Sequence, residues 1–355
     1  MRIIDKVAER AGVSVATVSR TFRSPEKLRE ETAARILSIA TEMGYAPKPR
    51  RPRRRTLESE KRSTIGYLFF AAHARELFTS NAFYGEILAG AKDEAERLKL
   101  SVEVEVASKF APPESLPEML RPGKVDGVLL VGAAPVSVLS FYSSTGHPLV
   151  NVDHVDPRGL HDSVLSDGID SAYAILDHLW ELGHRRIAFV RPISEAVTFA
   201  ERFRGYRIFL DEHDCAFDPS LVLKVGSYEE IVAGAGELIT SRAAPTAIFA
   251  VNDETASMVL HACHDKGVKV PESVSVAGFD DTSLAQRVWP PLTTVRVDTE
   301  EMGREAVRRL YELMKPRDGV ERSASRPPLC TRLNGHLVPR RSTGPVRSDE
   351  VLPHT

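Results

Sequence analysis

The chain has 355 residues, of which 42% are hydrophobic, and a formal net charge of −2. This length is enough for two or three domains. No apolar run approaches the ~20 residues that span a bilayer. The chain starts with a charged helix from Arg2, so no secretory signal is expected. The three scattered cysteines (Cys215, Cys263 and Cys330) exclude a disulfide framework and favour the cytoplasm.

The charge is distributed unevenly along the chain. Residues 1–62 hold 16 Lys and Arg against 8 Asp and Glu, a net charge of +8, whereas the rest holds 31 against 41, a net charge of −10. A basic head on an acidic body indicates that the head meets a polyanion and the body does not. The alternative is a solvated charged tail.

Residues 3–22 predict two short helices around one glycine. Val7, Ala8 and Ala11 form an apolar stripe at helical spacing, and Val18 and Phe22 return to it. Small residues on this stripe let two helices cross closely, which is helix-turn-helix geometry with the second helix in the DNA major groove. An ordinary helical hairpin is the alternative.

Three further features complete the predicted head. Gly12 can take the positive φ of the turn, and Ser14 is a good N-cap for the second helix. A third helix is expected from Arg29 to Met43, ended by Gly44. Its inward-facing residues are expected to be Ile36, Ile39, Ala40 and Met43.

Residues 47–55 contain three prolines and six basic residues, so no packed helix is expected there. They form a linker that also neutralises phosphates, or a linker alone.

Beyond Ser63, strand-like runs alternate with amphipathic helices, which predicts an α/β fold of parallel sheets flanked by helices. Such sheets bind ligands at the carboxyl ends of their strands. Strands are expected at 64–72, 102–106, 125–131, 149–152, 186–190, 247–251 and 274–279, with one more within 329–339. Helices are expected at 86–98, 169–182, 229–242, 254–266 and 300–314.

Motifs in a fixed order carry a family resemblance. In the head they are VA at 7–8, AGVS at 11–14, TVSR at 17–20 and GY at 44–45. In the body they are NAFYGEI at 81–87, VDG at 125–127, LGHRRIA at 182–188, RFRGY at 202–206, NDE at 252–254, VPESVSV at 270–276, GFDD at 278–281 and PLTTV at 291–295. In this order they resemble the lactose-repressor (LacI-type) family of bacterial transcription regulators over nearly the whole chain.

The resemblance implies a DNA-binding repressor with a two-lobed, periplasmic-binding-protein-like core that dimerises and holds a small effector between its lobes. No leucine heptad follows Arg340, so a homodimer is expected. The expected parts are a three-helix helix-turn-helix head (1–47), a basic hinge (48–62), a core (63–343) and a disordered tail (344–355). The expected lobes are 63–157 with 296–323, and 158–292 with 328–343, with crossovers near 155–159, 292–295 and 323–328.

The implied DNA contacts lie in the second helix and the hinge. Val15 and Ala16 can touch thymine methyl groups but cannot hydrogen-bond a base edge. Arg20 binds guanine or holds a phosphate. Leu57 takes the place of a leucine that opens the central base step in relatives, or is a plain linker residue. The full set is Ser14, Val15, Ala16, Thr17, Ser19, Arg20, Arg53, Arg54 and Leu57, of which Ser14, Thr17 and Ser19 contact phosphates or act as caps.

The implied effector residues are Phe83, Tyr84, Asp167, Arg202, Tyr228, Asn252 and Asp280. An Arg and an Asp that face one cavity suit a polyol, because Arg donates to adjacent oxygens and Asp accepts from hydroxyls. A sugar is therefore expected, with a purine or another small metabolite as the alternative. Each of four residues also has an alternative, purely structural role. Arg202 could form an ion pair, Asp280 a helix cap and Asn252 a turn, and Phe83 could belong to the apolar core.

Two other classes of protein compete with this interpretation. An enzyme is disfavoured, because the chain has no nucleophile elbow or phosphate loop. His261, Cys263 and His264 do not converge tetrahedrally on a helix, so no metal or other cofactor is expected. A periplasmic sugar-binding protein would explain the body, but it would not carry the basic head.

Overall fold

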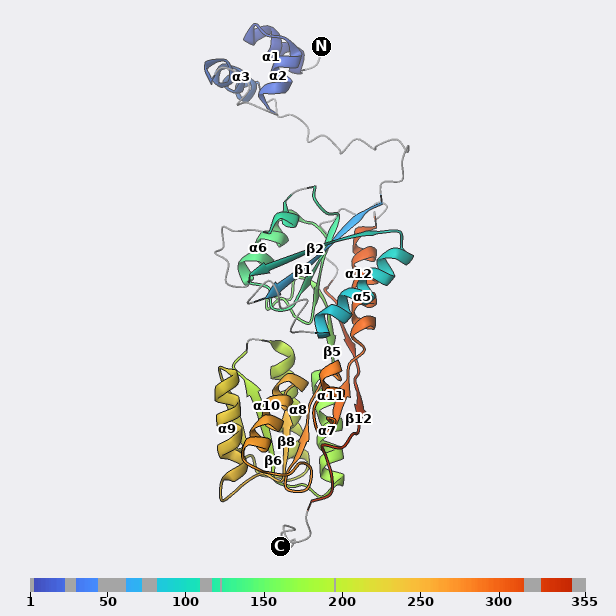
Figure 1. The fold of residues 1–355 in the computed structure, drawn as a ribbon. Helices are drawn as coiled ribbons and strands as arrows, with labels where there is room; N and C mark the ends of the chain where they lie inside the picture. The colour runs from blue at the N-terminus through green and yellow to red at the C-terminus, as the bar shows by residue number, and fades with distance from the viewer. Residues whose placement is uncertain are drawn as a thin grey trace. The chain divides into compact units, whose positions relative to one another are not determined.

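The computed structural model describes residues 3–22, 30–43, 62–71, 82–108, 117–121, 123–194, 196–315 and 327–346 (Figure 1). The chain divides into two compact units, Met1–Lys61 and Arg62–Thr355, called here the head and the core. The hinge residues Arg53, Arg54 and Leu57 lie outside the described residues.

The head contains three helices, α1 (Ile3–Ala11), α2 (Val15–Thr21) and α3 (Glu30–Glu42), as the sequence predicts. Gly12 takes a φ of +65° in the turn between α1 and α2. The expected apolar stripe is confirmed, because all three helices bury small or branched side chains against one another. This small core consists of Val7, Ala8, Ala11, Val18, Ile36 and Ala40.

The core holds two parallel sheets, each flanked by helices. The first lobe has six strands in the order β11-β5-β4-β3-β1-β2, and the second has four in the order β7-β6-β8-β9. In the first lobe the elements are β1 (Thr64–Ala71), α5 (Ala82–Arg97), β2 (Ser101–Ser108), η2 (Glu118–Leu120), β3 (Gly127–Val131), α6 (Val136–Thr145), β4 (Leu149–Val152), β5 (Asp162–Ser166), α12 (Thr299–Met314) and β11 (Cys330–Leu333).

In the second lobe the elements are α7 (Gly168–Glu181), β6 (Ile187–Pro192), α8 (Val197–Glu212), η3 (Pro219–Leu221), β7 (Val222–Val225), α9 (Tyr228–Thr240), β8 (Ala247–Ala250), α10 (Asp253–Asp265), β9 (Ser275–Ala277) and α11 (Ser283–Arg287). The antiparallel pair β10 (Thr294–Arg296) and β12 (His336–Val338) lies beside the second lobe. No helix of the described chain is both long and apolar enough to cross a membrane.

The chain crosses between the lobes three times, but two expected crossovers are about ten residues too early. β5 and β11 pair with each other in the first sheet, so the expected lobe boundaries at 158 and 328 are wrong. The chain leaves the first lobe between Ser166 and Gly168, returns between Arg296 and Thr299, and leaves again between Leu333 and His336.

The first lobe depends on a close contact between α5 and α12, which lie side by side (Figure 1). A Cβ atom on Gly303 would lie 2.0 Å from the backbone oxygen of Ile87, and one on Gly90 would lie 1.9 Å from that of Glu300. Glycine is therefore required at both positions, since backbone cannot yield as a flexible side chain can.

The beginning of the expected disordered tail is packed on the second lobe. The carbonyl of Gly344 lies 3.0 Å from the buried imidazole Nε2 of His184, and the Val346 amide donates to the carbonyl of Leu182. The expectation of disorder from residue 344 is thus wrong for residues 344–346, and 347–355 lie outside the described residues.

Candidate functional site

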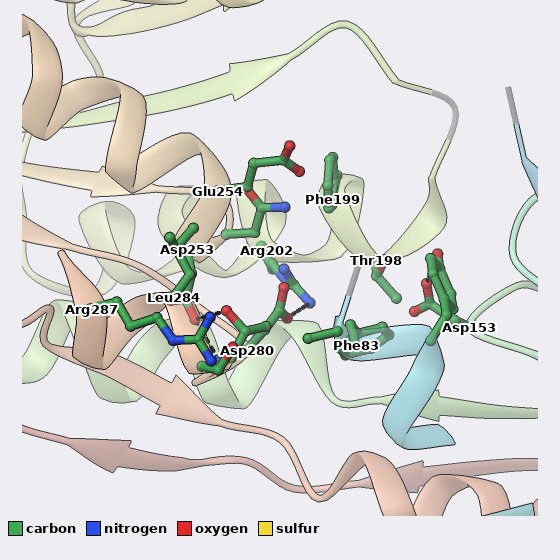
Figure 2. Close-up of a pocket in the computed structure, with 15 residues that line it drawn as sticks. Phe83, Asp153, Thr198, Phe199, Arg202, Asp253, Glu254, Asp280, Leu284 and Arg287 are labelled. Carbon is green, nitrogen blue, oxygen red and sulfur yellow. Dashed lines mark hydrogen bonds and ion pairs between the residues drawn. The ribbon is translucent and has the colours of Figure 1, made fainter. Parts of the chain in front are cut away.

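A cavity of about 300 Å³ lies where the two lobes face each other. The first lobe contributes the start of α5 and the residue after β4, and the second contributes the starts of α8 and α10 and the segment after β9 (Figure 2). Both sheets thus present their carboxyl ends, as expected for ligand sites of parallel sheets. Its lining consists of Ala82, Phe83, Tyr84, Asp153, Thr198, Phe199, Arg202, Asn252, Asp253, Glu254, Asp280, Thr282, Ser283, Leu284 and Arg287.

Arg202 is the central cation of the cavity and is 1% exposed. Its Nη1 donates to the carbonyl of Val251 at 2.7 Å, and its Nη2 donates to Oδ1 of Asp280 at 2.8 Å. The guanidinium also lies 3.7 Å from the ring centroid of Phe279. These contacts hold the planar group in one orientation, and its Nε has no partner among the described residues.

Asp280 and Asp281 are adjacent but have different roles. Burial raises the pKa of Asp280 to about 7, opposed by Arg202 and reinforced by the nearby carboxylates Asp253 and Asp153. Asp281 instead binds Arg296 at 2.6 Å and Arg340, outside the cavity lining. Neither residue caps a helix in the structure, which removes that alternative for Asp280.

On the first lobe, Tyr84 and Asp153 form a buried pair. The Tyr84 hydroxyl donates to Oδ2 of Asp153 at 2.8 Å, and the backbone oxygen of Tyr84 accepts from the Tyr67 hydroxyl at 2.9 Å. Oδ1 of Asp153 is buried and has no hydrogen-bond partner in the described part of the chain. Burial raises the pKa of Asp153 to about 6, against the lowering effect of Tyr84, Arg202 and the Thr198 hydroxyl. This carboxylate can accept a further hydrogen bond.

Asp253 links the cavity to a crossover strand. Its Oδ1 accepts from the Thr294 hydroxyl at 2.6 Å, and its Oδ2 accepts from the Thr282 amide at 2.7 Å. Burial raises the pKa of Asp253 to about 6 despite these hydrogen bonds. Because Thr294 lies on β10, Asp253 connects the cavity wall to the segment that joins the lobes.

Five of the seven effector residues expected from the sequence line this cavity, namely Phe83, Tyr84, Arg202, Asn252 and Asp280. Asn252 also caps α10 by accepting from the Thr255 amide at 2.9 Å. The other two do not line it. Asp167 caps α7 by accepting from the Ile169 and Asp170 amides, and Tyr228 is 46% exposed and lies 2.7 Å from His261.

Ten of the fifteen lining residues were not predicted from the sequence, among them Asp153, Thr198, Phe199, Asp253 and Arg287. Asp153 directly follows the predicted strand at 149–152, so its place at a carboxyl end was a usable signal. Thr198 and Phe199 start α8, a helix that the sequence analysis did not predict. Arg287 lies on the five-residue helix α11, which carries no periodic pattern.

The head places the described DNA-contact candidates along α2. The Ser14 hydroxyl accepts from the Thr17 amide at 3.1 Å, so Ser14 is an N-cap. Val15 is half-buried and packs against the head core, whereas Ala16 is exposed. The side chains of Ser19 and Arg20 lie outside the described residues.

A serine, a histidine and an aspartate line up in the first lobe as in a hydrolase. Asp156 lies 2.7 Å from Nδ1 of His161, whose Nε2 lies 3.1 Å from the Ser143 hydroxyl. However, that hydroxyl donates to the Leu139 carbonyl at 2.6 Å, and Arg158 also binds the aspartate. The chain of contacts therefore fixes a loop and lies outside the cavity lining.

The metal candidates on α10 have other surroundings. His261 lies beside Tyr228 and Asp265, and Cys263 is 1% exposed in the apolar core of the second lobe. Among the described residues, no three His, Cys, Asp or Glu side chains are grouped so that they could hold a metal ion.

Comparisons with known proteins agree with this architecture. Residues 3–48 match the bacterial regulatory proteins of the lacI family, and residues 176–343 match the periplasmic binding protein-like domain. The chain is 30% identical to the HTH-type transcriptional regulator DegA of Bacillus subtilis (strain 168), over 96% of this chain and 98% of that protein. It is 27% identical to the HTH-type transcriptional repressor PurR of Vibrio atlanticus (strain LGP32), over 91% and 95%.

A solved structure, the complex of the transcriptional regulator CelR with cellobiose, matches with a TM-score of 0.70 and 28% identity, over 96% of this chain and 99% of that chain. Regulators of this family act on DNA in the cytoplasm. With its helix-turn-helix head and its two parallel-sheet lobes, the chain belongs to the LacI family and is a DNA-binding transcriptional regulator with an effector domain, not an enzyme.

Proposed function

We propose that the protein binds a palindromic operator as a homodimer and represses transcription, and that a sugar in the cavity between the lobes controls its affinity for DNA. The observation that carries the sugar is the convergence of polar groups from both lobes on one cavity. Tyr84 with Asp153 comes from the first lobe, and Arg202 with Asp280 comes from the second. Carboxylates accept from hydroxyls, which a sugar offers in number.

The aromatic side chains of the cavity support the same ligand class. Phe83 is 6% exposed and meets Tyr84 edge to face at 5.3 Å between ring centroids. Phe199 lines the cavity from the second lobe. A pyranose has an apolar face that packs on such rings. A flat purine would also stack there, so a purine is the second candidate.

The segments that connect the lobes would let a sugar bound in the cavity influence DNA binding by the head. Three short segments join the lobes, and Asp253 binds one of them through Thr294. An effector that fits one lobe angle better than another shifts the balance between the two states only by its difference in affinity for them. Whether it releases or strengthens operator binding follows from which angle it favours.

The head supplies the sequence preference in this proposal. Ala16 is exposed on α2 and can reach a thymine methyl group, and Ser14 and Thr17 contact phosphates. Arg20 is the polar reader, and Leu57 with Arg53 and Arg54 contacts the minor groove. Arg20→Ala should flatten the preference among operator variants, and Leu57→Ala should weaken binding while the core melts unchanged.

The test has two parts. DNA selected from a random pool by the full-length protein should contain an inverted repeat, and a gel shift should show one dimer per site. When a panel of metabolites is then tested, a sugar should raise the melting temperature of the core. As a control, Asp177→Asn, at an exposed position of α7, should respond as the unaltered protein does. Selection of an asymmetric site, or a response to purines alone, would contradict the dimer or the sugar respectively.

A further inference from the structure

On the basis of this proposed function, we propose that the cavity takes an uncharged polyhydroxylated effector and rejects the phosphorylated or carboxylated form of the same molecule. The selection arises from the charges that line the cavity. Asp153 enters from the first lobe, and Asp253 and Asp280 enter from the second, whereas Glu254 also lines the cavity but is exposed, so water screens its charge. An anionic ligand would therefore meet carboxylates from both sides.

The cation that could compensate is already engaged. Of the described residues that line the cavity, Arg202 is the one buried cation. Two of the five N–H groups of its guanidinium are engaged, by the Val251 carbonyl at 2.7 Å and by Asp280 at 2.8 Å. The positive charge of Arg202 is thus already offset by Asp280, and a phosphate or carboxylate bound to the same guanidinium would lie close to that carboxylate.

The second arginine of the cavity, Arg287, compensates the charge of an anionic ligand less effectively than a buried cation would. Arg287 is exposed on α11 and makes no ion pair within the described chain. Figure 2 shows it on the side of the cavity away from Phe83 and Asp153. A charge in contact with water is screened, whereas Asp153 is 7% exposed and acts through a medium of low dielectric constant.

Two buried atoms show what an uncharged ligand can offer instead. Oδ1 of Asp153 lacks a donor and Nε of Arg202 lacks an acceptor among the described residues. A hydroxyl group donates and accepts at once, so a polyol can satisfy both atoms without adding charge. A phosphate or carboxylate oxygen placed there can only accept, and it would leave Oδ1 of Asp153 without a donor.

The experiment compares neutral sugars with their anionic forms on the full-length protein. Melting shifts and calorimetry would use D-ribose, D-glucose and cellobiose beside D-ribose 5-phosphate, D-glucose 6-phosphate and D-glucuronate. A neutral sugar should bind about 100-fold or more tightly than its anionic form, given charges a few ångströms apart at low dielectric constant. Equal or tighter binding of an anionic form would overturn this inference and leave the sugar effector standing. No response to any sugar would overturn both.

Two variants, Asp153→Asn and the control Asp177→Asn, test whether Asp153 causes the preference for the neutral sugar. Asp153→Asn removes one negative charge, so the preference for the neutral sugar should fall about tenfold. Asp177→Asn, exposed on α7, should leave the preference unchanged. An unaltered preference in Asp153→Asn would overturn the role of Asp153. The wild-type comparison decides the inference even where Asp153→Asn does not fold.

Discussion

Replacing Arg202 with methionine should destabilise the core by about 4 kcal/mol at pH 8. The side chain is 1% exposed, and the change removes two hydrogen bonds and the charge that faces Asp280. Breaking one partner of a buried ion pair costs about 3–5 kcal/mol, because the remaining charge is left in a medium of low dielectric constant. Methionine retains some of the packing on Phe279, so the electrostatic part should dominate.

The pH dependence of this loss identifies its cause. The pKa of Asp280 is raised on folding to about 7. A raised carboxyl pKa means that the folded state binds the proton more tightly, so the contribution of Asp280 to stability falls as pH rises from about 4 through 7. Without Arg202 this pKa rises further, and at pH 5.5 Asp280 is neutral. The cost of Arg202→Met should therefore shrink by about 2 kcal/mol at pH 5.5.

The reciprocal change should behave differently. Asp280→Asn leaves a buried guanidinium unpaired, at a cost of about 3–5 kcal/mol at pH 8. Asn does not titrate, so the variant lacks the fall in stability between pH 5.5 and 8 that the raised pKa of Asp280 causes in the unaltered protein, and its cost should not shrink at pH 5.5. The double variant should cost only about 1–2 kcal/mol, because both charges are gone. At pH 8 the coupling energy between the two positions is then about 5 kcal/mol or more.

Urea unfolding followed by fluorescence at pH 8 and 5.5 would measure these free energies. Arg204→Met, at an exposed position of the same helix, is the matched control and should change stability by less than about 0.5 kcal/mol. A loss below about 1 kcal/mol in Arg202→Met at pH 8, or one that is equal at both pH values, would refute the reasoning.

Three further predictions follow from packing and ion pairs. Gly303→Ala should destabilise the core by about 2 kcal/mol or more, because its Cβ would lie 2.0 Å from backbone oxygen; Gly234→Ala meets only the Leu223 side chain and should cost less in the same urea assay. Arg332→Gln should lower the free energy of unfolding by about 1–2 kcal/mol, because it breaks a bidentate ion pair at 2.8 Å with the buried Glu201. The same substitution should cost less in a Glu201→Gln background, and an equal cost there would argue against this prediction. Val18→Ala should lower head stability by about 2 kcal/mol, measured by hydrogen exchange, while core amides exchange unchanged.

The sequence predicted the parallel-sheet architecture well where the strands are apolar throughout. β3, β4 and β8 are buried along their whole length and β1 at every residue but Thr64, and each appears in the sequence as a short, mostly apolar run. β5 (Asp162–Ser166) was missed because it begins and ends with polar residues, although the structure buries all five. Asp162 is paired with Arg309, a residue distant in sequence, and the local pattern does not contain this partner.

The site was predicted through motifs more than through chemistry. Arg202 and Asp280 lie 78 residues apart, and nothing in either segment indicates that they meet at 2.8 Å. The family motifs located both. Asp167 and Tyr228 show the opposite failure, because an N-cap and an exposed tyrosine occupy positions that the resemblance assigned to the ligand.

The three crossings have a consequence for synthesis of the protein. β11 completes the edge of the first sheet, β12 pairs with β10 beside the second, and Gly344 lies against the buried His184. These pieces all lie within residues 330–346, so neither lobe is complete until the ribosome has made that segment. The head, whose buried core residues all lie between Val7 and Ala40, can fold some 300 residues earlier. During translation, a folded DNA-reading head therefore precedes the domain that regulates it.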